Sequence, residues 1–249
     1  DDFERFFNAI EPNALSAVMA VAMDMNASYN KLVEKHLPHA KIVYDRYHFQ
    51  AQFGKDVLGV VRLEEAKKHK QNAEKILDDI SDDTTKDEKR ELKSQAKAEK
   101  QSYASLKSAR WLLLMNNAKL SNSNAESLAK ILESHQDLAI CYAMKEEMRR
   151  LFTITDRKQA EQGWNAWFDA AEESNVPALV KFAELKRSRI CGLAAHAEFP
   201  INTGKLEGFN NKIKVAKRIG YGYRDDDFFF TLIRYLSLPS VKSLSPNFP

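Results

Sequence analysis

Residues 15–45 read LSAVMAVAMDMNASYNKLVEKHLPHAKIVYD, and this stretch decides the fold. The almost continuously apolar run 15–23 is typical of a strand buried on both faces, with a short core helix as the alternative. A helical pattern over 27–37 stops at Pro38, and KIVY at 41–44 is a second short strand. Because strand, helix and strand follow one another within about thirty residues, we predict a right-handed parallel crossover.

An aspartate follows each predicted strand, Asp24 after the first and Asp45 after the second. The carboxyl ends of adjacent parallel strands are where α/β sheets place their functional sites. His48 comes three residues after Asp45, so the two side chains can share a hydrogen bond and orient the site. The alternative, a histidine that is simply satisfied beneath the sheet edge, stays open.

The rest of the chain is predicted to be helical, since glycine and proline are scarce. Residues 62–100 carry equal numbers of acidic and basic side chains, which suits a solvated helical hairpin that turns at 81–85. A spacer arm without chemistry is the simplest interpretation of this hairpin. Further helices are expected over 102–115, from Ser121 or Ser123 to about 152, over 156–174, and from Pro177 to about 193. Trp164 and Trp167 are expected in the core of these helices, with base stacking as the alternative.

Residues 202–224, NTGKLEGFNNKIKVAKRIGYGYR, form a basic helix and the turn after it. Six lysines and arginines lie in this segment beside a single carboxylate, Glu207. A lone acid in so positive a setting is typical of a metal ligand held near a phosphate backbone, although an ordinary solvated helix face is an equal alternative. The side chains expected to hold DNA are Lys212, Lys214, Lys217, Arg218 and Arg224. After this segment, Asp225 is expected to cap a closing helix.

Composition sets further limits. The net charge is only +3, so any preference for nucleic acid must come from local clustering. The spacing of Cys141 and Cys191 suits neither a disulfide nor a zinc site, and both are expected to be buried. His69, His135 and His196 have no partner pattern and are expected to face solvent or the core. No apolar run is long enough to cross a membrane, and no signal peptide opens the chain.

Asp24 and Glu207 together suggest a chemistry. Oxygen ligands without a Cys or His cluster favour Mg²⁺ or Mn²⁺. Two such ions about four ångströms apart activate a water or a 3′-hydroxyl for in-line phosphoryl displacement. A strand end and a late helix packed on the same sheet can bring the two acids together. The residues therefore point to a metal-dependent nuclease, in which the nearby basic side chains hold the DNA strand.

Three motifs resemble bacterial insertion-sequence transposases of the DDE type, most of all the ISL-three lineage. They are VAMDMNASY (21–29), IVYDRYHF (42–49) and TGKLEGFNNKIKVAKRIGYGYR (203–224), supported by RWLLLMN (110–116) and CYAMKEEMR (141–149). The resemblance implies an α/β fold with a large all-α insertion, mostly helical overall: an RNase H-like core over 1–49, a helical insertion over 50–200, returning helices over 201–238 and a flexible tail over 239–249.

By this resemblance, Asp24 is the second acid of the catalytic triad and Glu207 the third, and both are metal ligands. Asp45 and His48 look like the auxiliary acid-x-x-His motif of related transposases. Such enzymes use Mg²⁺ to nick DNA and to join the freed 3′-hydroxyl to target DNA. The expected partners are transposon ends, target DNA and further copies of the chain in a synaptic complex, within the bacterial cytoplasm at the nucleoid.

The first acid of the triad has no credible counterpart here, because Asp1 and Asp2 begin a helical pattern rather than end an apolar strand. We therefore expect a C-terminal portion of a transposase with an incomplete RNase H-like fold, inactive alone because two carboxylates cannot hold two ions. One alternative is a truncated, non-catalytic DNA-binding product that regulates or inhibits transposition. Another is a structural helical protein in which the acids are incidental.

Overall fold

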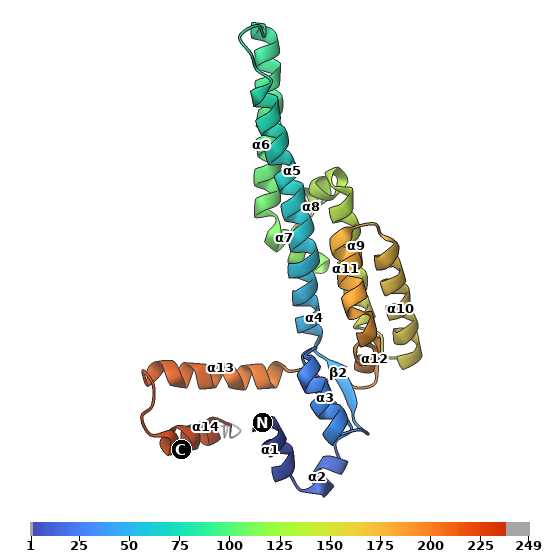
Figure 1. The fold of residues 1–249 in the computed structure, drawn as a ribbon, viewed down its shortest axis with the longest axis vertical. Coiled ribbons are helices and arrows are strands. Elements are labelled where there is room, and N and C mark those ends of the chain that lie inside the picture. The colour runs from blue at the N-terminus through green and yellow to red at the C-terminus, as the bar shows by residue number, and fades with distance from the viewer. Residues whose placement is uncertain (1, 238–249) are drawn as a thin grey trace, which may run out of the picture. The chain divides into compact units, whose positions relative to one another are not determined.

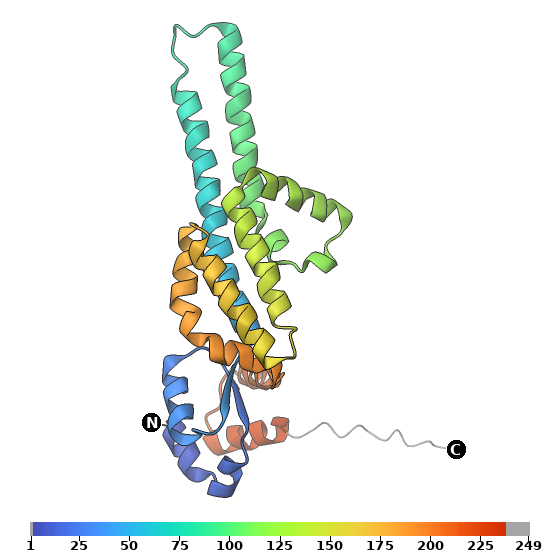
Figure 2. The same cartoon turned by 90° about the vertical axis from the view of Figure 1, so that its right-hand side faces the viewer.

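A computed structural model describes residues 2–237 of the chain (Figures 1 and 2). The chain divides into two compact units, Asp1–Ile201 and Asn202–Pro249, which are described separately. The predicted flexible tail, 239–249, lies outside the described residues. Within the described part of the chain, two short strands are accompanied by many helices, so the expectation of a mostly helical protein is confirmed.

The two strands of the first unit are β1 (Ala20–Met23) and β2 (Lys41–Tyr44), and they pair in parallel with Met23 opposite Tyr44. Helix α3 (Ala27–His36) connects them, capped by the Asn26 side chain, which accepts a hydrogen bond from the Ser28 N–H at 2.8 Å. The predicted parallel pairing with a connecting helix is therefore confirmed, whereas its right-handedness stays a prediction, and both aspartates directly follow a strand.

The predicted strand over 15–23 is wrong in its first half. Helix α1 (Asp2–Ala9) is followed by a second short helix, α2 (Pro12–Ser16), with Pro12 in its first turn. Proline suits that position because its fixed φ is helical and its missing N–H would have had no partner there. The strand is also not buried on both faces, since Ala20, Val21 and Ala22 are only partly buried.

One continuous helical rod leads away from β2. It consists of α4 (Arg46–Phe53), a π-helical turn η1 (Gly54–Leu58) and α5 (Gly59–Asp78). Helix α6 (Lys86–Ser108) returns alongside α5, which confirms the predicted charged hairpin (Figure 1).

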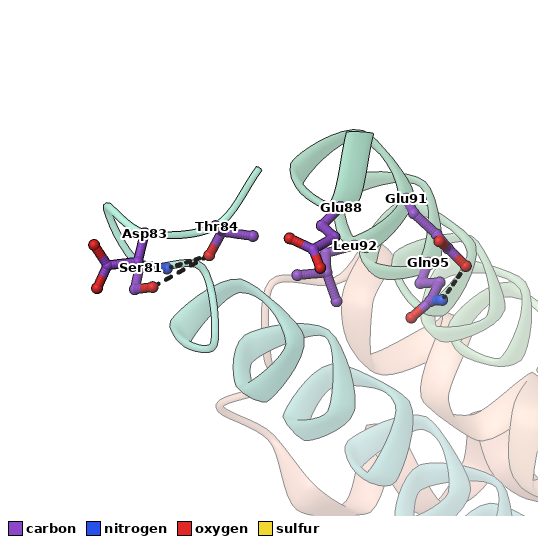
Figure 3. Close-up of a pocket in the computed structure, with 7 residues that line it drawn as sticks. All are labelled: Ser81, Asp83, Thr84, Glu88, Glu91, Leu92 and Gln95. Atoms are coloured by element: carbon purple, nitrogen blue, oxygen red, sulfur yellow. Dashed lines mark hydrogen bonds between the residues drawn. The ribbon is translucent and has the colours of Figure 1, made fainter. Parts of the chain in front are cut away.

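The hairpin turns where the sequence predicts it. Figure 3 shows the tip, where the Ser81 N–H donates to the Thr84 hydroxyl at 3.0 Å. Thr85 and Glu88 then form a capping box that starts α6, because each side chain accepts from the other residue's backbone N–H.

The remaining helices of the first unit pack beside the base of the hairpin (Figure 2). They are α7 (Arg110–Leu114), η2 (Asn117–Lys119), α8 (Asn122–Ser134), α9 (Gln136–Leu151), α10 (Arg157–Glu173), α11 (Pro177–Lys186), η3 (Arg187–Arg189), α12 (Ile190–Ala194) and η4 (Ala195–Ala197). The single helix expected from 121 to about 152 is two helices, because His135 has a non-helical backbone (φ −137°, ψ 89°).

The core of the first unit joins the strand region to the helices. Phe49 is fully buried, and its ring meets those of Phe152, Trp164 and Phe182 at centroid distances of 6.1, 5.5 and 5.4 Å. Trp164 and Trp167 are both buried, so their predicted core role is confirmed and base stacking is excluded for them in this structure. The predicted boundary between residues 49 and 50 and the RNase H-like topology stay predictions.

Two histidines that were expected to lack a partner contact each other. His69 and His135 lie with their Nε2 atoms 2.9 Å apart, while their Nδ1 atoms lie 2.6 Å from the Glu99 carboxylate and 2.7 Å from the Ile131 carbonyl oxygen. No local pattern reveals this pair, because the two histidines are 66 positions apart in the chain.

The second unit contains helices α13 (Gly204–Ile219) and α14 (Asp226–Ser237). Asp225 accepts a hydrogen bond from the Phe228 N–H at 3.0 Å, so it caps α14 as predicted. The turn between the helices passes through Tyr221 and Gly222, both with positive φ (48° and 94°). Gly222 adopts this conformation at little cost, because it has no Cβ.

Candidate active site

The ends of β1 and β2 place two carboxylates side by side. Asp24 directly follows Met23, and Asp45 directly follows Tyr44, the residue paired with Met23. The Asp45 N–H donates to the Met23 carbonyl oxygen at 3.0 Å, which extends the strand ladder to this point. Adjacent parallel strands thus bring together two acids that are 21 positions apart.

Asp45 holds the start of α4. Its Oδ1 accepts hydrogen bonds from the N–H groups of Tyr47 (2.8 Å) and His48 (3.2 Å), and the residue is only 3% exposed. An aspartate at this position satisfies helical N–H groups that otherwise have no partner, and its charge favours the helix N-terminus. Asp45 is therefore a structural anchor for the first turn of α4.

His48 links the two acids. Its Nδ1 lies 2.9 Å from Asp24 Oδ1 and 3.4 Å from Asp45 Oδ1. The first distance lies within the range of an ion pair between a protonated imidazole and a carboxylate. His48 is carried by the helix that Asp45 caps, so Asp45 fixes His48 and His48 in turn orients Asp24.

The support beneath β2 comes from residues far along the chain. The Tyr44 hydroxyl accepts a hydrogen bond from Arg189 Nη1 at 2.9 Å and lies 2.6 Å from the Asn30 side-chain amide. A Cβ on Gly192 would lie 2.5 Å from the Tyr44 ring, so only glycine lets α12 approach β2 this closely. The strand that carries Asp45 is therefore clamped between α3 and α12.

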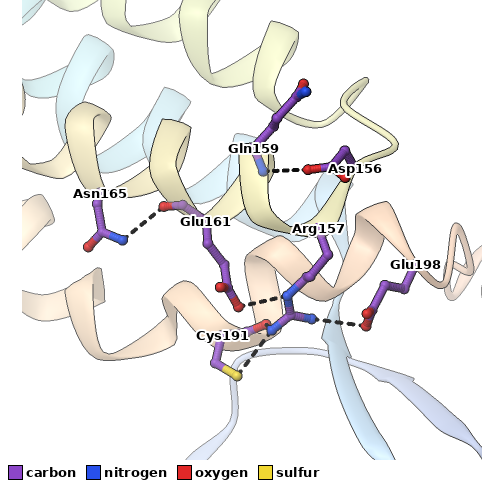
Figure 4. A network of polar contacts seen from close by, with 7 residues as sticks. All are labelled: Asp156, Arg157, Gln159, Glu161, Asn165, Cys191 and Glu198. Carbon is purple, nitrogen blue, oxygen red and sulfur yellow. Dashed lines mark hydrogen bonds and ion pairs between the residues drawn. The ribbon is translucent and has the colours of Figure 1, made fainter.

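A polar network at Arg157 holds the same group of helices together (Figure 4). The guanidinium of Arg157 contacts Glu161 at 2.8 Å, Glu198 at 3.4 Å and the Cys191 carbonyl oxygen at 3.1 Å. Cys191 was expected to be buried, and this is wrong. It is exposed and its Sγ lies 3.3 Å from Arg157, whereas Cys141 is buried as expected. Burial raises the pKa of the Cys141 thiol to about 12.

Asp24, Asp45 and His48 together form what we call the strand-end site. The availability of the Asp24 carboxylate decides what this site can do. Its side chain is about half exposed (48%), whereas Asp45 is committed to capping α4. Within the described part of the chain, no group of three or more His, Cys, Asp or Glu side chains is arranged to hold a metal ion. Asp24 thus offers an oriented, accessible carboxylate that needs further ligands to bind a cation firmly.

The second unit carries the other predicted acid. Glu207 lies in the first turn of α13 and is exposed, and its N–H donates to the Thr203 carbonyl oxygen at 2.9 Å. The basic residues predicted to hold DNA are all exposed: Lys212, Lys214, Lys217 and Arg218 on α13, and Arg224 in the turn that follows. The meeting of Asp24 and Glu207 stays a prediction, because they belong to separate units.

The turn after α13 is built on aromatic rings. Tyr223 stacks on Phe229 of α14 at a centroid distance of 4.9 Å, and its hydroxyl donates to the Ala216 carbonyl oxygen at 3.2 Å. The Lys217 ammonium lies 5.5 Å from the centre of the Phe229 ring. These contacts fix the angle between α13 and α14 within the second unit, although neither helix has a fully buried residue.

Among the described residues, no helix has both the length and the apolar composition needed to span a membrane.

Comparison with known proteins gives one consistent answer. A family model described as a transposase, of the DDE type and ISL3 group, matches residues 1–233. The transposase for insertion sequence element IS1001 of Bordetella parapertussis is 34% identical over 229 residues, which is 92% of this chain and 50% of that protein. The transposase for insertion sequence element IS1557 of Mycobacterium tuberculosis is 30% identical over 130 residues, 51% of this chain and 28% of that protein.

The chain thus spans about half the length of the IS1001 relative. No solved structure gives a significant match.

Proposed function

Since this chain belongs to the ISL3-like family of DDE transposases, we propose that it is part of the catalytic region that cuts and joins DNA at the ends of an insertion sequence. The observation that supports this most directly is the contact between His48 and Asp24 at the carboxyl ends of two parallel strands. This position is the usual place for a site on an α/β sheet.

The proposed roles follow from the environment of each side chain. Asp24 and Glu207 act as ligands for Mg²⁺ or Mn²⁺, since carboxylate oxygens are the donors these ions prefer and both side chains are accessible. When bound, such ions supply activation of the attacking oxygen and stabilisation of the leaving oxygen. His48 and Asp45 position Asp24.

The basic residues of α13 have a different task in this proposal. Lys212, Lys214, Lys217 and Arg218 neutralise phosphates and hold the strand next to Glu207, and Arg224 extends this surface. Contacts of this kind contribute affinity and register but do not read the base sequence. Several copies of the protein are expected to act together at paired transposon ends.

A cleavage assay on the protein encoded by the full open reading frame tests the proposal, because the remaining acid of the triad is expected there. Asp24→Asn and Glu207→Gln should each lower Mg²⁺-dependent strand cleavage by about a thousandfold, the scale on which loss of a charge-stabilising group acts. DNA binding by both variants should persist. Asp83→Asn, which changes an exposed acid at the hairpin tip, serves as the matched control and should cleave normally.

The alternative is a non-catalytic DNA-binding product that regulates or inhibits transposition. The exposed basic surface of α13 favours it, since that surface needs no metal to bind DNA. The same assay separates the two functions. Full cleavage by both Asp24→Asn and Glu207→Gln would refute the catalytic roles. Binding without any cleavage by the complete wild-type protein would favour the regulator.

A further inference from the structure

A cavity of about 570 Å³ lies beside the candidate active site, at the junction of α4, η1, α5 and α7. Its walls come from two segments that are far apart in the sequence, 47–63 and 110–114. We call it the rod pocket. Its lining includes Tyr47, Lys55, Arg62, Arg110, Trp111 and Leu114. Tyr47 is the neighbour of His48, and their rings are 5.8 Å apart.

Arg62 gives the rod pocket a positive charge that no acidic side chain pairs with among the described residues. The residue is only 7% exposed, and its Nη1 donates to the carbonyl oxygens of Leu106 (2.8 Å) and Lys107 (2.9 Å). Its buried Nε has no hydrogen-bond partner among the described residues. Burial and the nearby Arg110 lower the pKa of Arg62.

The lining residues offer nothing to neutralise that charge. Three of them, Lys55, Arg62 and Arg110, are basic, and none is acidic. Buried charges are normally paired, because an unpaired ion loses its hydration without compensation. An anion in the rod pocket would be attracted by its three cations and would offset the repulsion between Arg62 and Arg110.

The mouth of the rod pocket is aromatic. Trp111 is 72% exposed and Tyr47 is 68% exposed, although Trp164 and Trp167 are buried. The Arg110 guanidinium lies 5.6 Å from the centre of the Trp111 ring. An exposed tryptophan beside cations is typical of sites where a base stacks while its phosphate is neutralised.

The backbone here is also unusual. Residues 54–58 form a π-helical turn, a rare conformation that is frequent at functional sites. A Cβ on Gly54 would lie 2.6 Å from Leu114 Cδ2, so the glycine favours the close approach of α7. This approach brings Trp111 and Arg110 to the rod, and the rod pocket is a consequence of it.

We propose that the rod pocket binds one unpaired nucleotide of the DNA substrate, with its base stacked on Trp111 and its phosphate beside Arg62 and Arg110. The inference rests on the proposed function for the identity of the substrate. It adds that the DNA is locally opened next to the strand-end site. An unpaired base fits because a paired base keeps its faces within the duplex stack.

Tryptophan fluorescence provides a direct test, because Trp111 is the exposed one of the chain's three tryptophans. The purified protein is titrated with a duplex that carries one bulged adenine, with the same duplex fully paired, and with dAMP alone. The bulged duplex should quench the emission and bind about tenfold more tightly than the paired duplex, in line with the strength of base–aromatic stacking. Weak binding of dAMP is expected, since it lacks the flanking strand.

Single substitutions test whether Trp111 and Arg110 cause the quenching and the preference for the bulged duplex. Trp111→Ala should abolish both the quenching and the preference for the bulge, whereas Trp111→Phe should retain part of the preference. Arg110→Ala, at an exposed position, should lower the affinity for the bulged duplex without unfolding the protein. Lys107→Ala is the matched control, because Lys107 is a nearby exposed cation outside the rod pocket, and it should retain the preference.

The outcomes separate this inference from the proposed function. Equal affinity of wild-type protein for paired and bulged duplexes would overturn the nucleotide site, even if Asp24→Asn still abolished cleavage. Binding of dAMP as tight as that of the bulged duplex would also overturn it, because a free nucleotide would then be the ligand. A bulge preference that depends on Trp111 and persists in Asp24→Asn would support it independently of catalysis.

Discussion

The two units hold their predicted acids in opposite ways. In the first unit, Asp24 is oriented by His48, His48 is fixed by the helix that Asp45 caps, and the strand beneath is clamped by Tyr44 and Gly192. In the second unit, Glu207 projects from a helix without a fully buried residue. One acid is therefore preorganised by its own unit, whereas the other depends on a helix that has no core of its own.

The largest expected difference between the units is in stability. Phe49→Ala should lower the free energy of unfolding by about 3–5 kcal/mol, because it removes a fully buried ring that contacts four other aromatic residues. Phe230→Ala on α14, at an exposed ring, should change it by less than about 0.5 kcal/mol. Urea denaturation measures both. A loss of several kcal/mol in Phe230→Ala would show that α14 is packed against another surface in solution.

The second prediction concerns the orientation of Asp24. His48→Leu should weaken the binding of the Mg²⁺ that activates cleavage. It should also slow cleavage by about 10- to 100-fold, as loss of a residue that orients a metal ligand does in other proteins. His48→Asn should restore part of the activity, because an amide N–H at this position can donate to the carboxylate. The Mg²⁺ concentration for half-maximal cleavage is the decisive measurement. An unchanged value in His48→Leu would show that His48 does not position a metal ligand.

The third prediction sharpens the role of α13. The double variant Lys214→Ala/Arg218→Ala should reduce the slope of log affinity against log salt by about 1.8, if each side chain neutralises one phosphate. Lys93→Ala/Lys100→Ala, which removes two exposed lysines from the hairpin, is the matched control and should leave the slope unchanged. Equal slopes for all proteins would argue against DNA contact through α13.

The smallest expected effect is at the helix cap. Asp45→Ala should cost about 0.5–2 kcal/mol of folding stability, since two N–H groups of α4 lose their acceptor. Asp45→Asn should cost much less, because its side-chain oxygen can still cap the helix. If the two variants were equally stable, the carboxylate would not be acting as the cap.

Sequence reasoning worked best where a local signal was sharp. KIVY is bounded by Pro38 and Asp45, and its strand was predicted to the residue. The predicted caps at Ser121 and Asp225 likewise mark real helix starts. At both strand ends the sequence alone placed Asp24 and Asp45, since parallel strands fix where their carboxyl ends lie.

It failed where partners distant in sequence decide the structure. The run 15–23 has no periodicity that separates helix from strand, and β1 extends only as far as β2 can pair with it. The break between α8 and α9, at His135, has no glycine or proline nearby that would predict it. Arg62 resembles any other cation of a charge-balanced hairpin, and only the return of the chain at Leu106 buries it. Contacts of this kind depend on tertiary packing, which local patterns do not encode.

The π-helical turn has a geometric consequence for the hairpin beyond it. Residues 46–78 form one unbroken helical rod. The five residues of the π-helical turn therefore determine the direction, around the rod axis, in which each side chain of α5 points. In an α-helix one residue corresponds to about 100° of rotation and 1.5 Å of rise. Deleting a single residue here, with a return to regular α-helix, would therefore swing the whole arm around the rod axis by roughly a quarter turn. The length of this short segment thus sets the direction in which the hairpin faces, as a rotation about the rod axis relative to the strand ends.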